Sequence, residues 1–262
     1  MTTETAIIFE QRGGLAYVCL NRPEKRNALT REMLERLATL FAEIDARQDL
    51  RAVILTGAGT EAFSAGTDIA ELAALDGEAA ARRASERGQR VCELVEMCRV
   101  PVIAAVRGMA LGGGCELALA CHLRVASDDA LFRLPETKLG MIPAYGGTQR
   151  LARAVGTGRA LASMLAGESI TADEALRAGL VNRVVASAEV LAEAEAFAAA
   201  VAAQAPLAVR ACLEAVTRGA RLPLDEGLAL EAELFSRLFS TEDVREGTRA
   251  FLEKRPPVFQ GK

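Results

Sequence analysis

Residues 100–120, VPVIAAVRGMALGGGCELALA, contain the pattern from which the fold is best predicted. Val100–Val106 is a short apolar run rich in β-branched residues, which is typical of a buried strand. Glu116–Ala120 consists of good helix formers, so Gly112–Gly114 should lie between a strand and a helix. Glycines at such a place remove Cβ atoms, permit positive φ, and let backbone N–H groups at a helix N-terminus face an anionic group. The stretch therefore predicts an anion-binding turn with Glu116 beside it.

The sequence before this stretch alternates strand and helix patterns. Residues 7–10 and 15–20 predict the two strands of a hairpin, and Thr30 is placed to cap the helix that follows. A buried strand is expected over residues 51–56 and a helix over about residues 77–97. Strands and helices that alternate in this way predict an α/β fold.

The sequence after this stretch changes from mixed to helical. Short strands are expected at residues 122–126 and 130–132, before a second glycine-rich turn at residues 140–147. Thr171 and Glu174 have the spacing of a capping box. Helical patterns then follow at about residues 187–203, 207–218, 224–239 and 242–253. The chain thus predicts strand–helix units followed by a helical lobe.

Length, charge and cysteine usage limit the classes of protein to which this chain can belong. With 262 residues, 51% of them hydrophobic, it fits one large domain or one domain with an appended lobe. The 31 Lys and Arg residues against 35 Asp and Glu residues give a net charge of −4, which argues against nucleic acid or an anionic membrane as a partner. The six cysteines form no CxxC pair, as expected for reduced thiols in the cytoplasm.

Other features predict a soluble cytoplasmic protein without a metal site or a membrane segment. The N-terminus, MTTETAIIFEQR, lacks the basic segment and apolar run of a signal peptide. No window approaches the roughly 20 apolar residues that a membrane-spanning helix needs. The single histidine, His122, argues against a transition-metal site, so acid–base chemistry must rely on carboxylates.

Three features of the sequence are suited to chemistry on an acyl group. They are the glycine triplet, the small-residue loop Ala65–Asp68, and two glutamates beside turns, Glu116 and Glu136. Two N–H donors from separate turns can hold a thioester carbonyl as it becomes an enolate, and two carboxylates can act as acid and base. Each feature also has a structural explanation, since glycine triplets mark tight turns and a glutamate at a helix start complements the dipole. Spacing alone leaves both interpretations open.

The chain resembles the crotonase superfamily, and most closely the enoyl-CoA hydratases, from Ile7 to Phe259. The matching segments are NRPEKRNAL (21–29), FSAGTDIAEL (63–72), PVIAAVRGMALGGGCELALA (101–120), LPETKLGMIPAYGGTQRL (134–151) and FLEKRPPVF (251–259). Five matches in the same order are far more specific than one glycine triplet. The resemblance implies an α/β fold with a spiral core of ββα units over residues 1–195, which holds the active site, and a C-terminal helical trimerisation lobe over residues 196–262.

The resemblance also implies a reaction and its residues. The backbone N–H groups of Thr67 and Gly113 would form the oxyanion hole for the thioester carbonyl. Glu116 and Glu136 would hold one water, which adds syn to the C2=C3 double bond of a 2-enoyl-CoA to give a 3-hydroxyacyl-CoA, one glutamate acting as base and the other as acid. Such an enzyme is a hydro-lyase of fatty acid metabolism and β-oxidation, and it needs no cofactor because coenzyme A is part of the substrate.

Binding of coenzyme A is implied for a set of residues from three segments. They are Lys25, Arg26, Ala28, Ala65, Asp68, Ile69 and Lys254. The alternative for the basic residues is an ordinary solvated surface. Because the family forms trimers and dimers of trimers, a homotrimer or hexamer is expected, and Lys254 in the tail is expected to serve a neighbouring subunit.

The chain departs from the usual hydratase pattern at four positions. Ala144 stands where many hydratases have glycine, and an alanine forced to positive φ would be strained. Thr67 replaces a common alanine, and Tyr145 adds a ring that is expected to narrow the acyl pocket. His122 stands where aspartate is frequent and is expected to be structural.

Three alternatives to a hydratase remain open at this point. An enoyl-CoA isomerase or a cyclic dienoyl-CoA hydratase would share the fold and the oxyanion hole. A non-catalytic, RNA-binding member of the fold is opposed by the negative net charge and by the presence of both glutamates. The acyl chain, the pathway and the number of subunits do not follow from the sequence.

Overall fold

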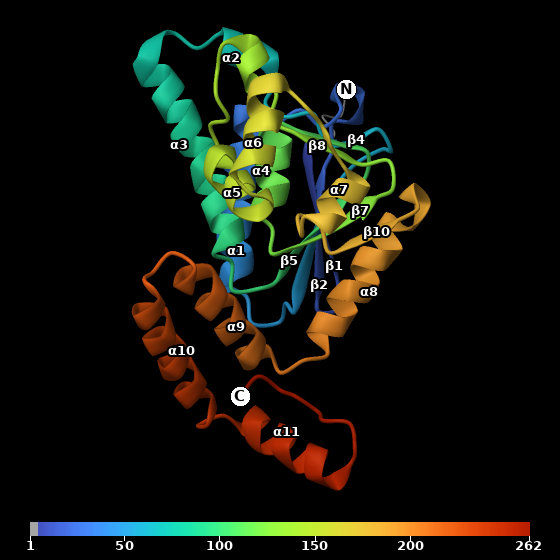
Figure 1. Cartoon of the computed structure of the whole chain (residues 1–262). Helices are drawn as coiled ribbons and strands as arrows, with labels where there is room; N and C mark the ends of the chain where they lie inside the picture. The colour runs from blue at the N-terminus through green and yellow to red at the C-terminus, as the bar shows by residue number, and fades with distance from the viewer. Residues whose placement is uncertain (1–4) are drawn as a thin grey trace.

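The larger of two β-sheets lies between α8 and the other core helices in the computed structural model, which describes residues 5–262 (Figure 1). Its six strands lie in the order β1-β2-β3-β5-β7-β10. Their bounds are β1 Ile7–Arg12, β2 Leu15–Leu20, β3 Ala52–Gly57, β5 Val102–Val106, β7 Leu123–Ser127 and β10 Arg183–Val185. β1 and β2 are antiparallel, which confirms the predicted hairpin, and all later neighbours in this sheet are parallel.

The smaller sheet contains four short strands in the order β4-β6-β8-β9. Their bounds are β4 Ala62–Ser64, β6 Met109–Leu111, β8 Leu131–Arg133 and β9 Ile170–Thr171. β4, β6 and β8 are parallel, whereas β9 is antiparallel to β8. Neither β4 nor β6, which lies inside the glycine-rich stretch, was predicted from the sequence. Strands of three residues are too short to show a period of two in the sequence.

Consecutive strands alternate between the two sheets. β3 is followed by β4, β5 by β6 and β7 by β8, and a helical segment follows each pair. This repeat is the predicted spiral of ββα units, and the fold prediction is confirmed. Because β4, β6 and β8 are parallel neighbours, their carboxyl ends meet at one edge of the small sheet. The segments that follow these strands are therefore brought together there.

The helices of the core cover the sheets, and two of them, α1 and α7, begin at the predicted caps. Their bounds are α1 Arg31–Ala46, α2 Ile69–Ala73, α3 Gly77–Glu96, α4 Gly113–Ala120, α5 Gly147–Val155, α6 Thr157–Leu161 and α7 Ala172–Arg177. Shorter 3-10 turns span Pro23–Lys25, Glu136–Leu139 and Ser187–Glu189, and a π-helical turn spans Ala162–Ala166. The Thr30 side chain accepts the N–H of Met33, and Thr171 forms the predicted capping box with Glu174.

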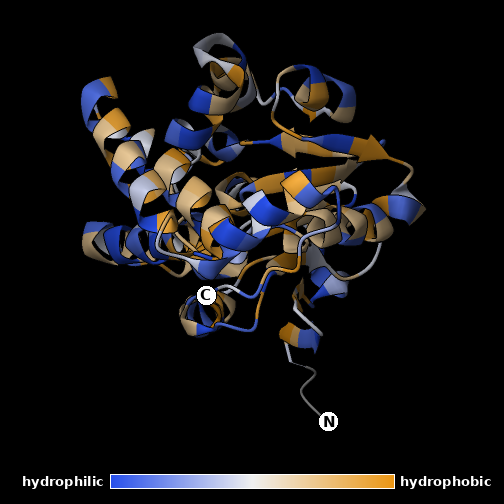
Figure 2. Ribbon diagram, turned by 90° about the horizontal axis from the view of Figure 1, so that it is seen from below, coloured by the Kyte–Doolittle hydropathy of each residue, from blue (hydrophilic) through white to orange (hydrophobic). Residues whose placement is uncertain are grey.

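The main core lies between the large sheet, the small sheet and helices α1, α3 and α4. Its largest fully buried side chains include Phe41, Phe63 and Phe132, one from α1 and two from the small sheet. Most helices carry hydrophilic and hydrophobic residues on different sides (Figure 2), as amphipathic helices packed on a core do.

The last four helices are α8 Val190–Ala202, α9 Pro206–Gly219, α10 Leu224–Leu238 and α11 Glu242–Glu253. α8 packs on the other face of the large sheet, where Ala194 and Ala198 contact the cluster that contains Ile54 and Ile103. α9, α10 and α11 extend beyond the end of the sheet (Figure 1). The predicted boundary between residues 195 and 196 falls inside α8, and residues 1–4 of the predicted first domain lie outside the described residues.

Within residues 5–262, no single helix is long and apolar enough to cross a membrane. Only the segments Ser187–Ala202 and Pro206–Gly219, bent by 106° to each other, pass that test as a pair.

Candidate active site

Glu116 is a buried carboxylate in the first turn of α4, with 1% of its surface exposed. Its Oε1 accepts the backbone N–H groups of Tyr145 and Gly147, each at 2.7 Å. Gly147 permits this approach, since a Cβ there would lie 2.9 Å from Oε1. Burial raises the pKa of Glu116 to about 7, although the two N–H groups and the nearby Arg150 charge oppose that rise. A carboxyl group with a pKa near neutrality can exchange protons at physiological pH.

Glu136 is the second carboxyl group of the site and begins the 3-10 turn after β8. A Cβ on Gly112 would lie 2.8 Å from Glu136 Oε1, and Gly112 has a φ of 48°, so only glycine suits this turn. The other oxygen, Oε2, is buried and has no hydrogen-bond partner within the described chain. Burial raises the pKa of Glu136, and its charge contributes to the raised pKa of Glu116. The two carboxyl groups therefore interact across the glycine turn.

The backbone N–H groups of Thr67 and Gly113 come from two loops in contact. We call them the oxyanion loops, after the role expected of these N–H groups. Thr67 follows β4, and Gly113 is the first residue of α4 after β6. A Cβ on Gly66, which has a φ of 99°, would lie 3.3 Å from Gly113 N and 2.8 Å from Leu111 O. Among residues 5–262, no acceptor is found for the N–H of Thr67 or of Gly113. Two unpaired N–H groups in neighbouring loops have the character of an oxyanion hole.

Tyr145 closes the space behind these two loops. The Thr67 hydroxyl donates to Tyr145 Oη at 3.0 Å. The ring packs on glycines of two helices: a Cβ on Gly88 of α3 would lie 1.9 Å from Cδ1, and a Cβ on Gly113 would lie 2.8 Å from Cε2. Burial raises the pKa of Tyr145 to about 12, so its phenol stays protonated at neutral pH. Tyr145 thus contacts the oxyanion loops with its ring and Glu116 with its N–H.

Ala144 is not strained. Among the described residues other than glycine, positive φ occurs at Arg26, Asn27 and Lys254 only, so Ala144 does not meet the condition under which strain was expected. The left-handed turn is made two residues later by Gly146, with a φ of 104°. The backbone at position 144, where many hydratases have glycine, is therefore compatible with alanine.

Two of the segments expected to bind coenzyme A lie side by side. Ala65 N donates to Arg26 O at 2.8 Å, and Leu29 and Thr67 form a parallel bridge. Ala28 lies between these contacts, and Ile69, the first residue of α2, is 56% exposed. The structure thus brings the segments 26–28 and 65–69 together beside the oxyanion loops.

The charged residues of these segments differ in whether other groups of the protein already pair with them. Lys25 is exposed. Arg26 is also exposed but forms an ion pair with Glu61 at 3.0 Å. Asp68 accepts the Ala70 N–H at the start of α2 and pairs with Arg22 at 3.1 Å, which lowers the pKa of Asp68. The carboxylate of Asp68 is therefore engaged by the protein itself.

Lys254 lies far from the site within one chain. It ends α11 with a φ of 54°, and α11 and α2 lie at opposite ends of the molecule (Figure 1).

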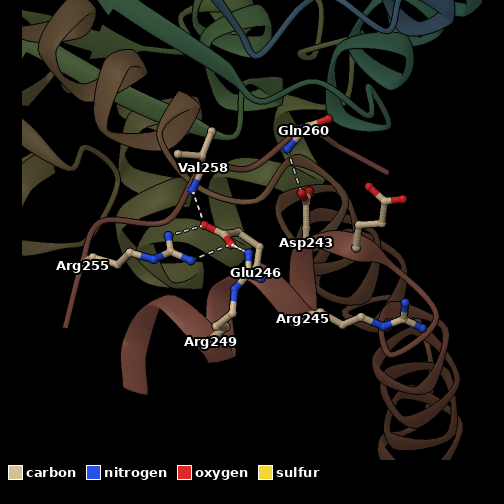
Figure 3. A pocket seen from close by; sticks show the side chains of 8 residues that line it. Asp243, Arg245, Glu246, Arg249, Arg255, Val258 and Gln260 are labelled. Atoms are coloured by element: carbon tan, nitrogen blue, oxygen red, sulfur yellow. Dashed lines mark hydrogen bonds and ion pairs between the residues drawn. The ribbon is translucent and has the colours of Figure 1, made fainter. Parts of the chain in front are cut away.

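A pocket of about 590 Å³ lies between α11 and the tail (Figure 3). There Glu246 pairs with Arg249 and Arg255, while Asp243 accepts the Gln260 N–H at 2.7 Å. These contacts hold the tail on α11.

His122 has a structural role. Its Nδ1 accepts the Val102 N–H at 2.9 Å, and its Nε2 lies 3.0 Å from the Glu96 carbonyl. Burial lowers its pKa to about 4. Within residues 5–262, no group of three or more His, Cys, Asp or Glu side chains has an arrangement that could hold a metal ion.

Sequence reasoning missed three side chains that support the loop around Tyr145. Ser85 and Gln89 of α3 donate to the Ala144 carbonyl at 2.8 and 3.1 Å, and Arg150 of α5 donates to the Tyr145 carbonyl at 3.0 Å. Ser85, Gly88 and Gln89 have the spacing of one helix face. That spacing was a signal, but nothing in the sequence says that this face meets a loop almost 60 residues away.

The comparisons with known proteins place these features in a family. Residues 10–262 match a family model described as enoyl-CoA hydratase/isomerase. The chain is 43% identical to a short-chain-enoyl-CoA hydratase of Clostridium acetobutylicum, over 95% of each chain, and 41% identical to a crotonyl-CoA hydratase of Syntrophomonas wolfei, over 98% of each. Its structure is similar to the crystal structure of an enoyl-CoA hydratase from Bacillus anthracis, with a TM-score of 0.94, 39% identity and coverage of 98% of this chain and 100% of that one.

Proposed function

This chain belongs to the enoyl-CoA hydratase/isomerase family, and we propose that it adds water to the C2=C3 double bond of a 2-enoyl-CoA. The observation that carries the proposal is the pair of buried carboxyl groups, Glu116 and Glu136, beside two unpaired backbone N–H groups. The product would be a 3-hydroxyacyl-CoA. The reaction needs no cofactor, since coenzyme A is part of the substrate.

The hydrogen bonds of the two carboxyl groups support different roles for them. Glu116 accepts two N–H groups, which favours its charged form and suits a base. Glu136 has a buried oxygen without a donor, which favours its neutral form and suits an acid. We therefore assign water activation to Glu116 and proton donation to Glu136.

The proposed addition of water conserves atoms and protons over one catalytic cycle. Glu116 takes a proton from water while the water oxygen forms a bond to C3. The electron pair of the double bond moves toward the thioester carbonyl, whose oxygen would accept the N–H groups of Thr67 and Gly113. C2 receives a proton from Glu136. Glu116 ends protonated and Glu136 ionised, and exchange of one proton between them restores both.

An enoyl-CoA isomerase and a cyclic dienoyl-CoA hydratase are the alternative reactions. Isomerisation moves a proton between carbons and can use a single carboxyl group, whereas hydration uses one group to activate water and one to protonate C2. The presence of both Glu116 and Glu136 therefore favours hydration. The relatives named as short-chain-enoyl-CoA and crotonyl-CoA hydratases support the same choice. Loss of the enoyl absorbance of crotonyl-CoA, followed by identification of the product, separates the three reactions. Absence of turnover with linear and cyclic enoyl-CoAs would disprove hydration.

We further propose that the acyl chain is short. The Tyr145 ring fills the space between α3 and the oxyanion loops. We infer that this space is the far end of the acyl pocket. A pocket closed by a buried ring leaves little room for additional methylene groups. The printed names of two relatives agree with this choice of substrate.

The C-terminal lobe supports a proposal about assembly. Several large apolar side chains on α10, at its C-cap and on α11 are more than half exposed in the single chain. They are Leu224, Leu228, Phe235, Phe239, Phe251 and Leu252. Exposed apolar residues in such number are typical of a surface that is covered in an oligomer. We propose a homotrimer or a dimer of trimers in which Lys254 serves the coenzyme A site of a neighbour; a cytoplasmic location remains a prediction.

Substitution of the two carboxyl groups tests the proposed chemistry. Glu116→Gln should lower kcat by about 10²–10⁴, because an amide cannot accept the proton of water. Glu136→Gln should lower it to a similar extent, because the amide is too weak an acid to protonate C2. Crotonyl-CoA hydration measures the rate, and calorimetric binding of the product measures retained affinity. An unchanged rate in either variant would remove that residue from the mechanism.

A further inference from the structure

The loop that holds Glu116 is itself held by side chains from two helices. The peptide group between Ala144 and Tyr145 donates its N–H to Glu116, and its carbonyl accepts from Ser85 and Gln89 of α3. Hydrogen bonds at the carbonyl polarise the amide and strengthen its N–H as a donor. The orientation of Glu116 therefore depends on groups that do not touch it.

Arg150 holds the next peptide group of the same loop. Its Nη1 donates to the Tyr145 carbonyl at 3.0 Å, and a Cβ on Gly146 would lie 2.2 Å from that nitrogen. The guanidinium thus lies directly against the backbone between the two N–H groups that bind Glu116. Its side chain is only 17% exposed, so little solvent screens its charge.

The other end of the Arg150 guanidinium is fixed by Glu96, the last residue of α3. Arg150 Nη2 donates to Glu96 Oε2 at 2.9 Å, and the same oxygen accepts from Arg221 between α9 and α10. Burial raises the pKa of Glu96, but the two guanidiniums lower it below its ordinary value. Glu96 therefore stays ionised, and it ties the loop to both α3 and the C-terminal helices.

We propose that Arg150 is a positioning residue that keeps Glu116 in its ionised, water-activating state. It orients the Tyr145–Gly147 loop toward the carboxylate, and it places a fixed positive charge near that carboxylate. The inference rests on the proposed hydration, because it assigns the base of that reaction. It also makes Glu96 the group that keeps the guanidinium in register with the loop.

The pKa of Glu116 depends on the titratable and charged groups that face it. These are Glu136 after β8, Arg150 on α5, Tyr145 in the loop, Cys92 on α3 and Cys115 on α4. Burial raises the pKa values of both thiols and of the phenol, so these three groups stay neutral near pH 7. Glu136 raises the pKa of Glu116, whereas Arg150 is the one cation of this set and lowers it.

The pH profile of an Arg150 variant tests the proposal. In Arg150→Met, Glu116 loses a neighbouring cation, its pKa rises, and the acid limb of kcat/KM for crotonyl-CoA moves to higher pH. We expect the loss of rate to be about tenfold greater at pH 6 than at pH 9, as a displacement by one pH unit implies. Arg150→Lys should restore most of the acid limb through its charge but retain a lower kcat, since one ammonium cannot bridge Tyr145 and Glu96.

Arg153 on the same helix provides a matched control. It is exposed, and its Nη1 donates to the Gln149 carbonyl at 2.9 Å rather than to the loop. Arg153→Met changes net charge equally and should keep the wild-type profile. A uniform loss of rate at all pH values in Arg150→Met, or an equal displacement in Arg153→Met, would overturn the proposal.

A second measurement separates this inference from the proposed reaction. The carboxyl carbon of Glu116 can be followed by NMR in folded protein labelled with ¹³C-glutamate, with Glu116→Gln identifying the signal. A higher titration midpoint in Arg150→Met than in wild type would support the proposal without any turnover, and equal midpoints would disprove it. If the wild type fails to hydrate enoyl-CoAs, the reaction is wrong, yet this comparison still decides the role of Arg150.

Discussion

Tyr145 performs two separate tasks with different atoms. Its backbone N–H holds Glu116, and its ring fills the space between Gly88 and the oxyanion loop. The first task is available to any residue except proline, because it uses only the backbone. The second depends on the size of the side chain. The two tasks can therefore be separated by substitution.

Removal of the ring should widen the range of substrates. In Tyr145→Ala, the N–H to Glu116 is kept, and the vacated volume should accept a longer acyl chain. We expect the ratio of kcat/KM for octenoyl-CoA to that for crotonyl-CoA to rise by about tenfold or more, since a few methylene contacts are worth that much. Hydration assays with 2-enoyl-CoAs of increasing length measure the ratio.

Tyr145→Phe is the matched control for that experiment. It keeps the ring and loses only the hydroxyl that accepts from Thr67 at 3.0 Å. Its preference for chain length should therefore stay that of the wild type. A Tyr145→Ala enzyme that remains restricted to crotonyl-CoA would show that other residues set the limit.

At the scale of single residues, the resemblance predicted which residues lie together in the candidate site but not which residues support them. Glu116, Glu136, Thr67 and Gly113 meet at one edge of the small sheet, as expected. Arg150 was missed, because a basic residue in an amphipathic helix looks like any solvated one. Its contacts are with the Tyr145 carbonyl, five residues away, and with the Glu96 carboxylate, 54 residues away, and no sequence pattern links these groups.

Helices with local start signals were the best-predicted elements. In α1, Thr30 accepts the Met33 N–H at 3.2 Å. The apolar residues with helical spacing in the sequence are all buried: Met33, Leu34, Leu37, Leu40, Phe41 and Ile44. The short strands β4 and β6 were missed, since their stability comes from pairing with each other and not from their own sequence. Local signals thus predicted α1, whereas the sheet that positions the site depends on distant partners.

The cap of α1 gives a prediction at the scale of the element. Thr30→Ala leaves the Met33 N–H without its acceptor and should lower the free energy of unfolding by about 1 kcal/mol. Thr39→Ala in the same helix is a suitable control, because the exposed Thr39 hydroxyl only bonds back to the Glu35 carbonyl. Urea unfolding followed by circular dichroism measures both. Equal stability of Thr30→Ala and wild type would show that the cap is dispensable.

At the scale of the whole molecule, the chain consists of a well-packed core and a C-terminal lobe whose apolar side chains are largely exposed in the single chain. Phe251 and Leu252 on α11 are 83% and 81% exposed. The sequence predicted the helices of this lobe, but not their path away from the sheet (Figure 1). Helical periodicity marks an apolar face without saying which surface covers it.

The proposed assembly predicts the effect of a charge on this surface. Phe251→Glu combined with Leu252→Glu should convert the oligomer to monomers, because burial of two carboxylates without partners is unfavourable. Leu176→Glu on α7, where the side chain is 44% exposed, should leave the assembly unchanged. Size-exclusion chromatography with light scattering measures the molar mass. A wild-type mass equal to that of one chain would contradict the proposal.

The contact between Gly88 and Tyr145 also restricts the order in which these positions can change during evolution. The three atoms nearest to a Cβ on Gly88 all belong to the Tyr145 ring, the first at 1.9 Å. Gly88→Ala would thus disrupt α3 or the loop around Tyr145 while tyrosine is present, whereas after Tyr145→Ala the ring no longer opposes it. The two substitutions are epistatic. Residue 145 must first be replaced by a smaller residue before residue 88 can gain a side chain. Once residue 88 has gained one, tyrosine no longer fits at position 145.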